Sequence, residues 1–176
     1  MYIVVGLGNP GEEYACTRHN VGRMAENFIE DSGEIKAKFL HLDTFMNKSG
    51  SGIAKFVKNK KEVEKLIVIY DDLDLPLGKQ KISYNRSSGG HRGVLSIIRA
   101  LKTENFIRFR IGIAPTTPSG KIKKPKGDKA VLDFILGKFK PSEEVILKKV
   151  FKTATEAVET IVSDGKEVAM NRFNSR

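Results

Sequence analysis

Residues 66–70 form an uninterrupted apolar run, LIVIY, with acidic residues directly after it. A strand with one face in water alternates apolar and polar residues, whereas a strand that is apolar throughout is typical of a sheet covered by helices on both faces. Residues 2–5 (YIVV) read as another short strand, followed at once by a glycine-rich turn. The chain is therefore expected to fold around a sheet buried between helices.

Helical and strand-like patterns alternate along the rest of the chain. They predict helices from Asn20 to Gly33, over residues 50–60, after Gly90 and from Pro141 to near Gly165, and strands at 36–41, 79–84 and 106–113. Ser142 is the expected N-cap of the last helix. Residues 114–129 hold three prolines, two glycines and a lysine run, which predicts a basic mobile loop. Because no polar linker interrupts this alternation, residues 1–176 are expected to form a single α/β domain.

Composition limits the classes of function. The chain has 40% hydrophobic and 30% charged residues, as globular proteins do, and no apolar run approaches the roughly 20 residues of a membrane span. It begins with a strand-like run and no secretory signal, so a cytoplasmic location is expected. The lone Cys16 excludes an internal disulfide. A net charge of +10 suits a polyanionic partner such as a nucleic acid.

The first glycine-rich turn matches a dinucleotide-binding pattern, with Gly6, Gly8 and Gly11 after a strand. That fold needs its last glycine to open a helix whose N-terminus holds a diphosphate. Here Glu12 and Glu13 follow, and both would repel a diphosphate. Nicotinamide chemistry is therefore not favoured.

Two groups of titratable residues are placed where α/β proteins build their sites. His19 follows the glycine turn and precedes a helix, and histidine is the side chain best suited to proton transfer near neutral pH. Asp71, Asp72 and Asp74 follow the central strand. These carboxylates suit a divalent metal, as in a nuclease; alternatively one orients a histidine, or the group only caps a turn. Asp71 is best placed to reach across the sheet edge, and Asp74 to shape the turn.

Two further motifs carry polar or backbone groups suited to substrate binding. Residues 44–50 (TFMNKSG) include Asn47, whose amide can donate to a carbonyl or accept from a water. Residues 89–93 (GGHRG) open a helix with two glycines, which lets backbone amides approach an anion. Each motif alone is a weak signal.

The motifs in series are specific. The segments GLGNPGEEYACTRHNVG, TFMNKSG, DDLDLPLG, GGHRG and FIRFRIGI occur in this order, and the chain closes with VLDFILGKF and DGKEVAMNRF. This arrangement closely resembles the bacterial-type peptidyl-tRNA hydrolases over nearly the whole chain. The resemblance implies a three-layer α/β/α sandwich with a mixed, mostly parallel sheet. It also implies metal-independent, cofactor-free hydrolysis of the ester between a peptide and the 3′ ribose of a tRNA, by a monomer.

The resemblance also implies the site residues. Asn9, His19 and Asp71 match the active site, with His19 as general base oriented by Asp71, and Asn9 and Asn47 left open between positioning the carbonyl, positioning the water and stabilising the oxyanion. Tyr14 and Met46 match positions that supply apolar walls for the terminal adenosine or the peptide. Lys81 and Arg110 match the basic positions that contact the tRNA 5′-phosphate. A nearby basic position of the family falls at Ser83 instead.

Three departures from the family pattern stand out. Arg92 replaces the usual asparagine, and it either contacts a phosphate or carboxylate or leaves the site. The stretch before Thr44 is shorter than usual, with Leu42 and Asp43 where a proline is expected. The loop at 114–129 is longer and more basic, and we expect it to lie over the substrate channel. A non-catalytic RNA-binding protein on the same fold is the main alternative to an enzyme.

Overall fold

The computed structural model describes residues 1–33 and 35–174. In chain order the elements are β1 (Ile3–Gly6), η1 (Glu12–Tyr14), η2 (Arg18–Asn20), α1 (Val21–Asp31), β2 (Lys38–Phe39), η3 (Met46–Lys48), α2 (Ser49–Ile53), α3 (Lys60–Glu64), β3 (Leu66–Pro76), β4 (Gln80–Tyr84), α4 (Arg92–Leu101), β5 (Ile107–Ala114), α5 (Asp128–Ile135), α6 (Pro141–Asp164) and α7 (Lys166–Phe173).

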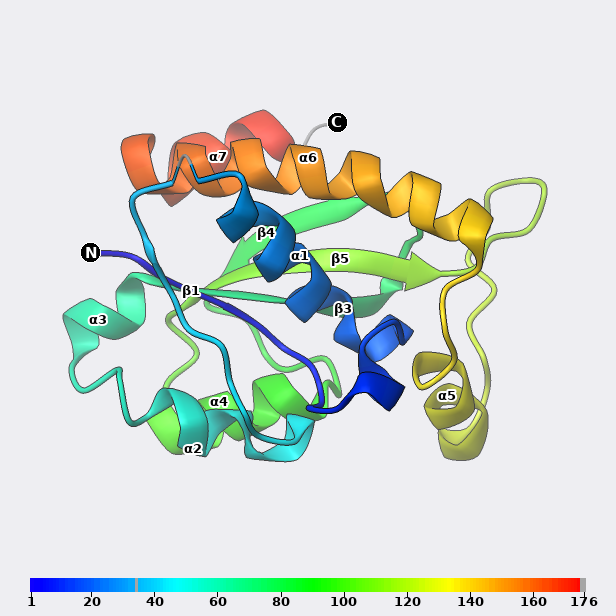
Figure 1. The fold of residues 1–176 in the computed structure, drawn as a ribbon, viewed down its shortest axis with the longest axis horizontal. Helices are drawn as coiled ribbons and strands as arrows, with labels where there is room; N and C mark the ends of the chain where they lie inside the picture. Colours follow the sequence, from blue (N-terminus) through cyan, green and yellow to red (C-terminus); the bar gives the residue numbers. More distant parts are fainter. Residues whose placement is uncertain (34, 175–176) are drawn as a thin grey trace.

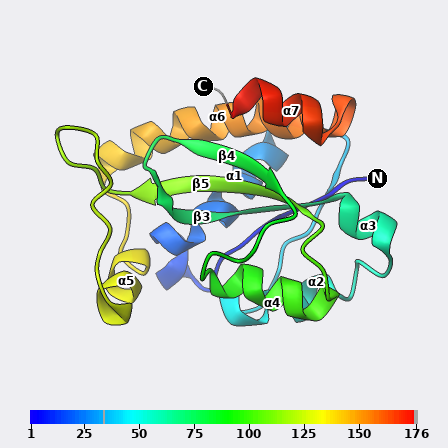
Figure 2. The same ribbon diagram turned by 180° about the vertical axis from the view of Figure 1, so that it is seen from behind.

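The strands form one mixed, mostly parallel sheet in the order β2-β1-β3-β5-β4. Strands β2, β1, β3 and β5 run parallel, and only β4 is antiparallel to its neighbour. Helices α1, α6 and α7 cover one face, while α2 and α4 cover the other (Figures 1 and 2). The expected three-layer α/β/α arrangement is confirmed.

The apolar run in β3 is explained by burial on both faces. Ile67 and Ile69 pack into the core shared with α1 and α6, whereas the alternate residues Leu66, Val68 and Tyr70 pack into the core beneath α4. Successive side chains of a strand point to opposite faces, so both sets had to be apolar. The strand is longer than predicted, because its pairing with β5 continues past Tyr70 to Pro76.

Close packing of α1 on the sheet accounts for two glycines. A Cβ on Gly6 would lie 2.2 Å from the carbonyl oxygen of Gly22, and a Cβ on Gly22 would lie 2.2 Å from that of Ile69. The third glycine of the turn, Gly11, opens only the three-residue η1. The glycine motif therefore lets a helix approach two strands, and the helix that a dinucleotide would need at Gly11 is not there.

The prediction of one helix over residues 50–60 is wrong. The segment forms α2, which ends at Ile53, and a separate α3 that begins at Lys60. The side chain of Asn59 accepts a hydrogen bond from the backbone N–H of Glu62 at 3.1 Å. Asparagine is a strong N-cap, so it starts a new helix rather than extending the old one.

The other corrections concern boundaries. Helix α6 is capped by Lys140 rather than Ser142, because Pro141 occupies the first helical turn, where a missing N–H costs nothing. Helix α5 begins at Asp128, within the predicted loop, and α7 follows Gly165 where no element was predicted. The strand predicted over 36–41 is limited to the two residues of β2. No helix in the described part of the chain is long and apolar enough to cross a membrane.

Candidate active site

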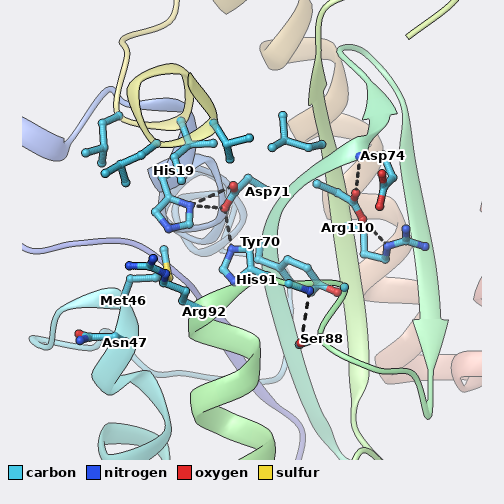
Figure 3. A pocket seen from close by; sticks show the side chains of 18 of the residues that line it. His19, Met46, Asn47, Tyr70, Asp71, Asp74, Ser88, His91, Arg92 and Arg110 are labelled. Carbon is cyan, nitrogen blue, oxygen red and sulfur yellow. Dashed lines mark hydrogen bonds and ion pairs between the residues drawn. The ribbon is translucent and has the colours of Figure 1, made fainter. Parts of the chain in front are cut away.

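A pocket of about 840 Å³ lies at the carboxyl ends of β1 and β3. Ligand sites of open parallel sheets are found at this edge, because the loops that follow neighbouring strands meet there. Its lining includes Asn9, which follows β1, and Asp71, within β3. Residues that were far apart in the sequence motifs therefore face one cavity, shown from close by in Figure 3.

His19 and Asp71 are in direct contact on the pocket wall. Nδ1 of His19 lies 2.9 and 3.0 Å from the two carboxylate oxygens of Asp71. His19 belongs to η2, which is anchored by the hydrogen bond from the N–H of Arg18 to the carbonyl of Gly137 at 3.0 Å. Because Nδ1 faces a carboxylate, it carries the proton, and Nε2 is left as the basic nitrogen.

Sequence reasoning missed a second imidazole at the same carboxylate. Nε2 of His91 lies 2.8 Å from Oδ1 of Asp71 (Figure 3). Nδ1 of His91 accepts from the N–H of Val94 and so caps α4. That bond makes Nε2 the protonated nitrogen, which donates to Asp71. The only signal in the sequence was the Gly-Gly pair before it: Gly89 and Gly90 have φ of 57° and 85°, a left-handed turn that glycine adopts at low cost.

The electrostatics of this trio suit a base that is held ready. Burial opposes the charged form of Asp71, but the two neighbouring imidazoles and their hydrogen bonds outweigh it and hold the pKa of Asp71 well below its usual range. Burial also opposes protonation of His19, but the Asp71 carboxylate outweighs burial and raises the pKa of His19 above 6.5. The positive charge of Arg92 acts on His19 in the opposite direction.

Asn9 lines the same pocket as His19 and is fixed by hydrogen bonds. Its backbone N–H donates to Oδ1 of Asn20, and its carbonyl accepts from Nδ2 of Asn20, both at 2.9 Å. Its side-chain oxygen accepts from the N–H of Met46 at 2.8 Å. The side-chain NH₂ of Asn9 is therefore the group left to act as a donor. Gly8 leaves room for the Asn20 side chain that makes these two hydrogen bonds, since a Cβ on Gly8 would lie 2.9 Å from Cγ of Asn20.

The other expected residues fall into two groups. The pocket is lined by Tyr14, Met46, Asn47, Arg92 and Arg110. Arg92 has therefore not left the site. Lys81 does not line the pocket; it lies opposite Arg110 in the pairing of β4 with β5. Nε of Arg110 is 2.6 Å from Oδ2 of Asp72, and Arg110 is 4% exposed, so this cation is already paired.

The three acidic residues of β3 do not form a metal-binding group of their own. Asp71 faces the histidines, Asp72 pairs with Arg110, and Asp74 pairs with Lys124 at 2.5 Å. In the described residues, the grouping with metal-ligand spacing is His19, Asp71 and His91, whose ligand atoms lie within 4.8 Å of one another. The same three side chains are joined by hydrogen bonds through the Asp71 carboxylate.

A buried arginine shapes the pocket wall and was not expected to contribute. Arg108 of β5 is fully buried and donates to the carbonyls of Arg86 and Ser87. Both residues line the pocket and precede the Gly-Gly turn. Arg108 therefore holds residues 86–87, which lead to His91, against the sheet.

The comparisons agree with this geometry. The family model described as peptidyl-tRNA hydrolase matches residues 3–41 and 28–176. The peptidyl-tRNA hydrolase of Fervidobacterium nodosum is 41% identical over 187 residues, covering 98% of this chain and 96% of the relative. That of Chloroflexus aggregans is 38% identical over 195 residues, covering 99% of each. Both alignments are longer than the 176-residue chain, so these relatives contain residues that this chain lacks.

The solved structures give the same result. The crystal structure of peptidyl-tRNA hydrolase from Acinetobacter baumannii superposes with a TM-score of 0.86 at 28% identity, covering 99% of this chain and 95% of that one. With the family model and full-length relatives above 30% identity in agreement, this chain belongs to the peptidyl-tRNA hydrolase family.

Proposed function

We propose that this protein hydrolyses the ester bond between a peptide, or an N-blocked amino acid, and the 3′ ribose of a tRNA, and so releases the tRNA for reuse. The observation that carries the proposal is the 2.9 Å contact between Nδ1 of His19 and Asp71, in a pocket of a chain that belongs to this family. Its net charge of +10 suits a tRNA partner.

His19 acts as the general base. Its Nε2 takes a proton from a water molecule while the water oxygen attacks the ester carbonyl carbon. The bond from that carbon to the ribose 3′ oxygen then breaks, and the 3′ oxygen receives the proton from the imidazolium. Asp71 fixes the tautomer and stabilises the imidazolium, and a base of this kind contributes about 10²- to 10⁴-fold to the rate.

The asparagines divide the remaining work. Because the side-chain oxygen of Asn9 is used by Met46, its NH₂ group is suited to the carbonyl oxygen, where negative charge develops. Asn47 is exposed at the pocket, and we assign it to the water or the terminal nucleotide. Tyr14 and Met46 supply apolar walls, which the side chains of Leu132 and Ile135 from α5 extend.

The contact with the tRNA 5′-phosphate is assigned to Lys81. The side chain of Lys81 is exposed, whereas the guanidinium of Arg110 is paired with Asp72 and links β5 to β3. Lys124 lines the pocket from the basic loop at 114–129, which supports the idea that this loop borders the substrate channel. We further propose that the protein acts as a monomer in the cytoplasm, where translation supplies the substrate.

The test is release of a labelled N-acetylated amino acid from its tRNA, with and without a chelator. Turnover that withstands the chelator and leaves intact tRNA is expected, and would exclude a metal-dependent nuclease. His19→Ala should lose about 10²- to 10⁴-fold in kcat while its affinity for tRNA changes little. Tight tRNA binding by the wild type without any ester hydrolysis would instead support a non-catalytic RNA-binding protein.

A further inference from the structure

Arg92 brings a positive charge to the reacting end of the pocket. It is the first residue of α4, directly after His91, and it lines the same cavity as His19. In Figure 3 its side chain extends from the start of α4 past Met46 on the side of the pocket where His19 lies. The guanidinium is near enough to oppose protonation of the His19 imidazole.

The side chain of Arg92 is available to a ligand. Of the other cations that line the pocket, Arg110 pairs with Asp72 and Lys124 pairs with Asp74. Lys48 and Arg86 also line it and are exposed, but Arg92 is the cation whose charge acts on His19. Within residues 1–33 and 35–174, the Arg92 side chain makes no hydrogen bond or ion pair, and it is exposed to solvent. A guanidinium presents planar pairs of N–H donors that match two oxygens of a phosphate.

The substrate carries one fixed negative charge near the ester. The terminal nucleotide bears the reacting ester on its ribose, and the phosphodiester on its 5′ side lies only one sugar away. A peptide chain supplies no constant charge at this distance. If His19 meets the ester, a cation beside His19 is within reach of that phosphodiester.

We propose that Arg92 binds the phosphodiester on the 5′ side of the terminal nucleotide and so sets the position of the ester against His19. This inference rests on the proposed function and adds a substrate contact to it. The contact also has an electrostatic consequence. The bound phosphate neutralises Arg92, so the charge that opposes protonation of His19 in the free enzyme is cancelled in the complex.

The experiment removes the charge of the substrate phosphate, the charge of Arg92, or both. An N-acetylaminoacyl-tRNA is prepared with a phosphodiester or an uncharged methylphosphonate at the last internucleotide link. Each is given to the wild type, to Arg92→Gln and to Arg99→Gln. Arg99 is an exposed residue of the same helix outside the pocket, so its substitution controls for net charge and for changes in α4.

The methylphosphonate should lower kcat/KM of the wild type and of Arg99→Gln by about 10- to 100-fold, the range expected for a charge-assisted hydrogen-bonded pair. Arg92→Gln should be slow on both substrates and nearly indifferent to the change. The rise of its kcat/KM with pH should also occur at a higher pH than in the wild type, because the cation that lowers the pKa of His19 is gone. Equal sensitivity of all three proteins, or an insensitive wild type, would overturn the assignment of Arg92. Failure of the wild type to hydrolyse the unmodified substrate would instead overturn the proposed function.

Discussion

Replacing Asp71 by asparagine tests the hydrogen-bonded trio most directly. His91 donates from Nε2 to Oδ1 of Asp71, because its Nδ1 is occupied by the N–H of Val94. The amide oxygen of Asn at position 71 is therefore expected to take the Oδ1 position. Its NH₂ group then lies where Oδ2 was, 3.0 Å from Nδ1 of His19, and competes there with the amide oxygen, which lies 2.9 Å from the same nitrogen. A donor there favours the tautomer of His19 that carries its proton on Nε2, and that nitrogen can no longer accept one.

The magnitude follows from the cost of the alternative orientation. Turning the amide so that its oxygen faces His19 sets NH₂ against the N–H of His91, and an unmatched buried donor costs about 1–3 kcal/mol. This leaves the productive orientation about 10- to 100-fold less populated. The imidazolium also loses a stabilising carboxylate. Together these effects predict that Asp71→Asn lowers kcat by about 10²- to 10⁴-fold without unfolding the protein.

A second substitution makes the reasoning specific. His91→Asn retains a side chain that can cap α4 but removes the donor that faces position 71. In the double variant the amide is free to turn its oxygen toward His19, so kcat should recover about 10-fold or more from the level of Asp71→Asn. The assay is single-turnover release of the labelled N-acetylated amino acid, with thermal unfolding as the control for folding. A double variant no faster than Asp71→Asn, or an Asp71→Asn enzyme within about 3-fold of wild type, would refute this account.

Three further predictions use other parts of the structure. Because the pKa of His19 is raised above 6.5 and the base must be neutral, kcat/KM should rise with pH through a value above 6.5; an acid limb below it would contradict the Asp71 contact. Charge reversal of Lys121, Lys123 and Lys126 should flatten the salt dependence of tRNA binding by about 0.7–0.9 per lost phosphate contact, and an unchanged slope would exclude the loop from the interface. Burial raises the pKa of Glu26 from 4.5 to about 8. As the pH rises, the carboxyl group ionises at a lower pH in the unfolded state than in the folded state, so the unfolding free energy of the wild type falls between these two pKa values. The unfolding free energy of Glu26→Gln, measured in urea, should therefore increase relative to that of the wild type by up to about 5 kcal/mol as the pH rises from about 5 to about 9. A pH-independent difference would show that Glu26 is not buried as a neutral acid.

The layered fold was predictable because its signals are local. The apolar run of β3 requires cover on both faces, and α1 has the amphipathic spacing of a helix packed on a sheet. His19 and Asp71 could be paired from sequence because each lies beside the end of a parallel strand, and such ends share one edge. The break between α2 and α3 was also signalled locally, by Asn59, although the helical spacing of the apolar residues concealed it.

The partners across the sheet were decided by tertiary structure alone. His91 meets Asp71 because it caps α4 at the pocket, while Arg108 of β5 holds the segment before α4 against the sheet. Likewise Asp72 meets Arg110 because β3 and β5 are neighbours, a pairing that no spacing along the chain reveals. The physical reason is that periodicity reports which face of an element is buried, whereas strand order determines which buried or polar groups meet. The sequence by itself therefore determined the layers and the base, and the packed sheet determined the groups that hold that base in place.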